Sequence, residues 1–386
     1  MKKLIKYYTF VFMFLFTAYF QTYAEEKQKE YKFTEIKKLP ISSIKNQYRT
    51  GTCWSFSVLS VLESEIISMG YEEIDLSDMF IVRNAYSEKA TKYVRMHGSI
   101  KFSGGGALDD PIKMIKKYGI VPEEIYPGLK KGEKKHNHHE MDEILKGYVD
   151  KIIESQDNKL SPVWYDGFKS LLDTYLGEIP DSFEFKGETY TPKTYLTKYN
   201  INLDDYVLIT SFSHHPFYKK FILEVPDNWS WGEAYNLPLE DLKQTLYYAI
   251  ENNHTIAWAT DISDIGFQYR KSGIAIVPEK NWDEMTDEEM DIAISSPVLQ
   301  KNISQELRQT AFDTYETQDD HGMQIYGTAK DQDGNNYFIV KNSWGITNSK
   351  YNGILYASES YVLYKTLSIL LNKNGIPIEI RNKLGL

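Results

Sequence analysis

The side chain of this chain best suited to chemistry is a single thiol. Cys53 is the only cysteine among 386 residues, and it lies in the stretch QYRTGTCWSFS, which begins at Gln47. A lone thiol cannot form an internal disulfide, so it is either a small buried side chain or a reactive group. The neighbouring residues favour the reactive group.

The residues after Cys53 predict a helix that begins close to the thiol. Gly51 and the threonines beside it are unsuited to a helix interior, and Gly70 is a typical stop. The apolar positions that share one helical face are Val58, Leu59, Leu62 and Ile66. Unpaired N–H groups and the helix dipole in the first turn favour a thiolate. Gln47 could donate a hydrogen bond to an oxyanion beside the Cys53 backbone N–H.

A thiolate nucleophile needs a proton carrier, and His321 is the best placed of the eight histidines. It opens the alternating run HGMQIYGTA, which is followed by the turn DQDGNN and the run NYFIVKNSWG. This pattern predicts a β-hairpin. His321 begins its first strand and Asn342 ends its second, so both lie toward the same end. Asn342 can orient the imidazole there, and Trp344 can cover the pair from water.

The remaining histidines predict neither a metal site nor a cofactor site. His214 and His215 follow an apolar strand-like run, which favours a structural role. The turn DQDG lacks the other ligands of a calcium loop, so a plain Asp-Gly turn is expected. A solvated loop is predicted for the lysine-rich stretch that contains His136, His138 and His139.

The order of Gln47, Cys53, His321 and Asn342, with the block NSWG, resembles the papain-type cysteine peptidases. Longer segments resemble the branch of bleomycin hydrolase and aminopeptidase C, and the similarity covers most of residues 35–376. These segments are SGGGALDDPIKMIKKYGIVPEEIYP, MDEILKGYVDKIIES, TPKTYLTKYN, IAWATDIS and the hairpin itself.

The resemblance implies an α+β, papain-like fold of two lobes. A helical lobe and a β-barrel-like lobe would enclose the active site in the cleft between them. One peptidase domain would span residues 25–386. A helical insertion and lobe connection would occupy about 128–255, and a mainly β lobe with the hairpin about 256–386.

The resemblance also assigns catalytic roles. Cys53 would be the nucleophile, His321 its base and acid, and Asn342 the group that orients His321. Gln47 would help to form the oxyanion hole. Attack by a thiolate paired with imidazolium would give an acyl-enzyme, which water then hydrolyses.

Peptides are therefore the expected substrates and partners. Gly105 and Gly106 match the glycine pair whose backbone pairs with extended substrates in papain-like enzymes, and Trp344 would line the same cleft. A flexible turn is the alternative interpretation of the glycine run.

Residues 1–24 have the pattern of a secretory signal peptide. Three lysines precede the apolar run TFVFMFLFTAYF, which is shorter than the roughly 20 residues of a membrane span. An uncleaved anchor is the alternative. Export to the periplasm, the cell surface or the medium is expected, with no stable membrane association after cleavage. The formal charge of −10 argues against a nucleic-acid partner.

The C-terminus departs from the branch that the chain resembles. Members of that branch extend further, and their terminal carboxylate receives the free amine of the substrate inside the cleft. Here IEIRNKLGL follows Pro377. The sequence leaves open whether this short tail reaches the cleft and confers specificity for free N-termini. The insertion implies a homo-oligomer, which is a hexamer in the family, but the sequence leaves the oligomeric state open as well.

Three functions remain open on the sequence alone. They are an aminopeptidase of the bleomycin hydrolase type, an exported endopeptidase with an open cleft, and a catalytically inactive papain-like scaffold used for binding. The intact set of catalytic residues argues against the third.

Overall fold

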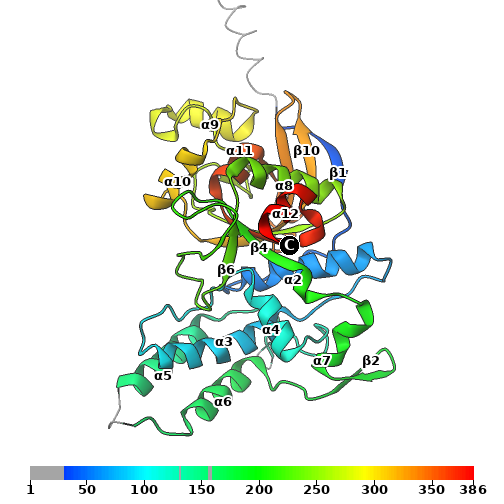
Figure 1. Cartoon of the computed structure of the whole chain (residues 1–386), viewed down its shortest axis with the longest axis vertical. Coiled ribbons are helices and arrows are strands. Elements are labelled where there is room, and N and C mark those ends of the chain that lie inside the picture. Colours follow the sequence, from blue (N-terminus) through cyan, green and yellow to red (C-terminus); the bar gives the residue numbers. More distant parts are fainter. Residues whose placement is uncertain (1–29, 130–131, 155–158) are drawn as a thin grey trace, which may run out of the picture.

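A computed structural model of the chain describes residues 30–129, 132–154 and 159–386. The expected signal peptide, residues 1–24, lies outside these ranges. Within them, no helix combines the length and the apolar character that crossing a membrane requires. Figure 1 shows a helical lobe below and a sheet lobe above, with helix α2 between them.

The helical lobe is built around α2, which packs against helices on one side and against the sheet on the other. The side chains of α2 from Trp54 to Ile66 are all buried. The expected apolar face is therefore only part of the buried surface, because three further apolar side chains, four serines and two glutamates are buried as well. The other elements of this lobe are α3 (Asp78–Arg95), α4 (Asp110–Tyr118), α5 (His139–Glu154), α6 (Trp164–Leu176), β2 (Phe183–Phe185), β3 (Glu188–Tyr190) and α7 (Pro192–Tyr195), and α2 itself spans Cys53–Ser68.

The sheet lobe contains a mixed sheet in the order β5-β6-β4-β13-β7-β10-β11-β12-β9-β8, with β1 paired to β10. Its strands are β1 (Phe33–Lys38), β4 (Tyr206–Thr210), β5 (Lys220–Ile222), β6 (Glu233–Asn236), β7 (Ile256–Thr260), β8 (Phe267–Gln268), β9 (Ile274–Ala275), β10 (His321–Asp331), β11 (Asn336–Lys341), β12 (Ile354–Ser358) and β13 (Thr366–Asn372). Its helices are α8 (Leu239–Glu251), α9 (Asp287–Ser295), α10 (Gln305–Asp313), α11 (Glu359–Lys365) and α12 (Ile378–Leu384).

The predicted hairpin is present as β10 and β11, which pair in antiparallel fashion from Gln324↔Lys341 to Lys330↔Asn336. The side chain of Asp331 accepts hydrogen bonds from the backbone N–H groups of Asp333 and Asn335, at 3.0 and 2.9 Å. The DQDG segment is thus a side-chain-stabilised turn, as expected.

The C-terminal helix α12 packs onto α8 in the core of the sheet lobe. Ile380 and Leu384 are buried there. Lys383 forms an ion pair with Asp241 at 3.3 Å. These contacts hold α12 against α8, and Figure 1 shows the two helices near each other in the sheet lobe.

A buried ionic cluster fastens the segment before Gln47 to the helical lobe. The Nζ atom of Lys45 lies 2.9 Å from Glu63 on α2 and 3.0 Å from Asp78 on α3. Both carboxylates are almost fully buried. The cluster therefore sets the path of the chain toward the thiol.

Replacing Lys45 with methionine should strongly destabilise the fold. The change leaves two buried carboxylates without their cation, which typically costs about 3–5 kcal/mol. Urea unfolding would measure the loss. Lys151→Met is the matched control, because its ion pair with Glu154 is solvent-exposed, and we expect little change there. Equal losses for the two variants would contradict the role assigned to the cluster.

Candidate active site

Cys53 is the first residue of α2, as the sequence predicts. A residue in this position has a backbone N–H without an intrahelical acceptor. The start of β10 packs directly on it, since a Cβ atom at Gly322 would lie 3.2 Å from the Cys53 carbonyl oxygen and 3.0 Å from Ser57 Oγ. Glycine at this position therefore lets His321 approach the thiol.

His321 and Asn342 form the predicted pair at one end of the hairpin. His321 Nε2 lies 2.8 Å from Asn342 Oδ1, which also accepts a hydrogen bond from the Ser343 N–H at 2.7 Å. Because the partner is an acceptor, Nε2 carries the proton and Nδ1 is left for the thiol. Trp344 covers the imidazole with ring centroids 4.8 Å apart.

Gln47 is buried, and its amide is held in one orientation. Its Oε1 accepts a hydrogen bond from Ser343 Oγ at 2.6 Å, and its Nε2 donates to the carbonyl oxygen of Thr50 at 2.8 Å. The amide nitrogen has a second proton. Since Gln47 and Cys53 line the same cavity, this proton can serve a developing oxyanion.

The surroundings of the thiol and the imidazole disfavour an isolated charge on either. Burial and, to a smaller extent, the carboxylates of Asp319 and Asp227 together raise the pKa of Cys53 to about 12. Burial lowers the pKa of His321 to about 4, opposed by its hydrogen bond to Asn342. A thiolate can therefore form here only as the partner of an imidazolium, by proton transfer within the pair.

The glycine run forms a tightly packed wall of the cleft. The indole N–H of Trp54 donates to the carbonyl oxygen of Gly104 at 3.0 Å. A Cβ atom at Gly106 would lie 2.9 Å from the Trp54 ring, and one at Gly105 would lie 2.0 Å from Asp227 Oδ2. A side chain at Gly106 would clash with the Trp54 ring, whereas one at Gly105 would displace the Asp227 carboxylate.

The cleft is a cavity of about 550 Å³ that collects most of the predicted residues. Cys53, His321 and Gln47 line it, and Asn342 lies directly behind His321. Residues 378–386 are not part of its lining. The predicted substrate-binding residues that line it are Gly105, Gly106 and Trp344.

Sequence reasoning missed the charged residues of the cleft, which are Asp227, Asp319, Asp320 and Lys101. Asp227 Oδ1 pairs with Lys101 Nζ at 2.7 Å. Burial, followed by the nearby Asp227, raises the pKa of Asp319 to about 7. Asp319 and Asp320 directly precede His321, so the sequence could have placed them near the active site. No motif near Asp227 in the sequence indicates that it lies in the cleft.

The predicted solvated loop is exposed at residues 132–135 and at Asn137 and His139, but His138 departs from the prediction. Only 4% of His138 is exposed, and burial lowers the pKa of its imidazole to about 3. The segment is drawn inward by backbone pairing with Arg49, whose N–H donates to the carbonyl of His136 and whose carbonyl accepts from the N–H of His138.

Two family models and several curated proteins match the chain. Residues 174–385 match the model of the peptidase C1-like family, and residues 28–163 match that of the papain family of cysteine proteases. Aminopeptidase G of Lactobacillus delbrueckii subsp. lactis is 22% identical, over 80% of this chain and 76% of that protein. Aminopeptidase C of the same organism is also 22% identical, over 88% and 81%.

A solved structure supports the fold. The crystal structure of PepW from Lactobacillus rhamnosis HN001 superposes with a TM-score of 0.69 at 19% identity, and the match covers 91% of this chain and 84% of that one. The predicted papain-like α+β fold is thereby confirmed. Since the first family model spans more than half of the chain, the protein belongs to the peptidase C1-like family of cysteine peptidases.

Proposed function

We propose that the protein is a cysteine aminopeptidase, which removes residues from the free N-terminus of peptides. The observation that carries this proposal is the position of Asp227. Its carboxylate lies against Gly105, on the wall where the resemblance places the part of the substrate before the scissile bond. A carboxylate there both shortens the cleft and attracts the substrate's ammonium group.

The segment that carries Asp227, residues 223–232, is a fixed part of the cleft. Asn228 closes it on itself, since its Nδ2 donates to the carbonyl oxygens of Leu223 and Gly232 at 2.9 and 3.0 Å. Lys113 of α4 donates to Ser230 Oγ at 2.7 Å. The segment leaves the sheet lobe after β5 and is held on the helical lobe. The backbone at Asp227 is therefore fixed close to Gly105.

The charge of the cleft supports the same function. The residues that line the cavity include three with carboxyl groups, Asp227, Asp319 and Asp320, and one lysine, Lys101. The buried Lys89 lies behind the glycine run, where it donates to the carbonyl oxygen of Gly105. An α-ammonium group would supply a second cation at partly desolvated carboxylates, where charge-assisted hydrogen bonds are strong. An acetylated N-terminus has no charge and needs additional space. The relatives named aminopeptidase G and aminopeptidase C also support this specificity.

The proposed mechanism uses the residues already placed. The thiolate of Cys53 attacks the carbonyl carbon of the first peptide bond, while the Cys53 N–H and Gln47 Nε2 donate to the oxyanion. The imidazolium of His321 gives its proton to the leaving amine. His321 then takes a proton from water, which attacks the acyl-enzyme and releases the amino acid.

A cleavage assay on two peptides of one sequence, with a free or an acetylated N-terminus, tests the proposal. We expect stepwise cleavage of the free peptide alone. In Asp227→Asn, kcat/KM for it should fall by about 10- to 100-fold, mainly through KM, since a hydrogen bond to a charged group is lost. Asp166→Asn, at an exposed aspartate of α6, is the matched control and should change little.

The other outcomes identify the alternatives. Cleavage of both peptides at internal bonds would make the protein an endopeptidase with an open cleft. Cleavage of neither peptide, without labelling of Cys53 by a thiol-directed peptide inhibitor in folded protein, would make it a binding scaffold.

A further inference from the structure

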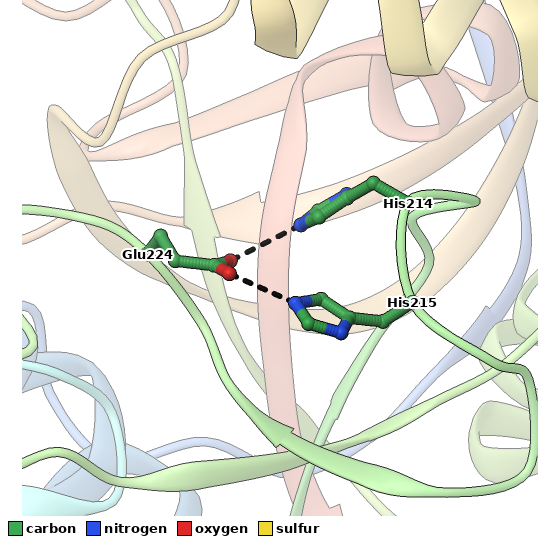
Figure 2. Close-up of side chains that lie close together, drawn as sticks. All are labelled: His214, His215 and Glu224. Carbon is green, nitrogen blue, oxygen red and sulfur yellow. Dashed lines mark hydrogen bonds and ion pairs between the residues drawn. The ribbon is translucent and has the colours of Figure 1, made fainter.

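Two histidines and a glutamate come together on the sheet lobe, apart from the residues that line the catalytic cavity. His214 and His215 follow β4, and Glu224 follows β5. Figure 2 shows both imidazole rings directed at the carboxylate, with Nε2 to oxygen distances of 3.1 Å for His214 and 2.8 Å for His215. One ligand atom from each side chain lies within 4.8 Å of the others, the one such group of three that the described residues contain.

A buried glutamine stands behind His214 and suits either tautomer of its ring. Gln309 of α10 presents its Nε2 at 3.1 Å and its Oε1 at 3.3 Å from His214 Nδ1. When Nε2 of His214 donates to Glu224, Nδ1 can accept from the amide nitrogen. When Nε2 binds a metal ion, Nδ1 must carry the proton and can donate to the amide oxygen. The orienting group that a metal-bound histidine needs is therefore already present.

The loop that carries the two histidines is fixed before any ligand binds. Asn236 is fully buried, and its Nδ2 donates to the carbonyl oxygens of Phe212 and His215 at 2.7 and 2.9 Å. The ring of His215 also stacks on Phe221, with centroids 4.2 Å apart. Little conformational entropy would be lost on binding, because the imidazoles are already positioned.

We propose that His214, His215 and Glu224 bind one divalent transition-metal ion, with Zn²⁺ as the expected ion. Two imidazoles and one carboxylate form a ligand set typical of zinc, whereas Ca²⁺ and Mg²⁺ prefer sites built only from oxygen. The side chain of Glu224 is 55% exposed, so an ion can enter and water can complete its coordination.

The position of the site gives the ion a structural consequence. Glu224 lies at the beginning of residues 223–232, the segment that brings Asp227 into the cleft. A bound ion would fasten the start of this segment to the loop after β4. The site does not depend on the proposed aminopeptidase activity, because none of its ligands lines the catalytic cavity.

Zinc titration by calorimetry tests the proposal, in a Cys53→Ala background that removes the only thiol as a competing ligand. We expect one equivalent of Zn²⁺ to bind, an increase in Tm with added ZnSO₄, and no comparable effect of MgSO₄. His214→Ala/His215→Ala should lose both the binding and the shift. His139→Ala removes an exposed histidine elsewhere and should lose neither.

Three results would overturn the proposal. They are no zinc binding by the folded protein, unchanged binding by the double variant, and equal binding of Mg²⁺. If the folded protein binds no zinc, the three side chains form only a hydrogen-bonded cluster. If the double variant does not fold, Glu224→Gln replaces it, since this exposed change keeps the shape of the side chain and should weaken zinc binding at least tenfold.

Discussion

Replacing Cys53 with alanine should abolish peptide hydrolysis, with a decrease in kcat/KM of about 10⁵-fold or more, on the scale of losing the nucleophile in a serine protease. The expected loss is this large because the substitution removes the proposed nucleophile and with it the covalent route. Gln47 and the Cys53 backbone N–H would remain, but without an attacking atom they have no oxyanion to stabilise.

The measurement is a steady-state assay on a free-amine peptide, together with thermal unfolding to show that the fold is kept. The chain offers an unusually clean second readout. Because it contains no other cysteine, labelling by a thiol-directed inhibitor must occur at Cys53 and must vanish in the variant. Activity that survives the substitution would remove Cys53 from the mechanism.

Replacing His321 with alanine should lower the acylation rate by about 10²- to 10⁴-fold, the usual contribution of a positioned acid–base group. The variant should also have a distinctive pH dependence. The surroundings of Cys53 raise its pKa to about 12, so without an imidazolium partner the thiol is neutral near pH 7. The thiolate fraction then grows tenfold with each pH unit, and residual activity should rise steadily up to about pH 10.

Single-turnover acylation between pH 6 and 10 would check this result. The acylation rate of the wild-type protein should be constant over the pH range in which the rate of the variant rises. His97→Asn is the control, because His97 is exposed and asparagine tolerates its positive φ of 52°. A flat profile in His321→Ala, or a loss of equal size in the control, would mean that another group is the base.

The positions of Cys53, His321 and Asn342 could be predicted from the sequence because they depend on local patterns. Alternation of apolar residues around an Asp-Gly turn predicts the hairpin, and the hairpin alone brings His321 and Asn342 to one end. Similarly, Gly51 and the apolar spacing after it are enough to place Cys53 at the start of a helix.

The features that the sequence did not reveal depend on contacts between distant segments. Asp227 reaches the cleft only because residues 223–232 cross from one lobe to the other. His138 is buried because its segment pairs with Arg49, although its lysine-rich surroundings indicate a solvated loop. The convergence of His214 and His215 on Glu224 depends on the turn between β4 and β5, which no local pattern specifies.

Export, the signal peptide and the oligomeric state stay predictions from the sequence. The domain boundaries at 128 and 255 are also untested, although the structure divides that interval. Its first part forms helices of the helical lobe, and its second part contributes β4, β5, β6 and α8 to the sheet lobe.

The segment that carries Asp227, residues 223–232, also bears on which proteins the enzyme could digest. Its hydrogen bonds and the Lys101 ion pair tie it to the helical lobe, so the cleft cannot widen there without breaking these contacts. A chain end would have to thread into this narrow space as a free strand. Compact proteins, whose termini are docked, would therefore be spared, while short or unfolded peptides would be degraded. Residues 223–232 would in this way protect the structured proteins of the same compartment from digestion.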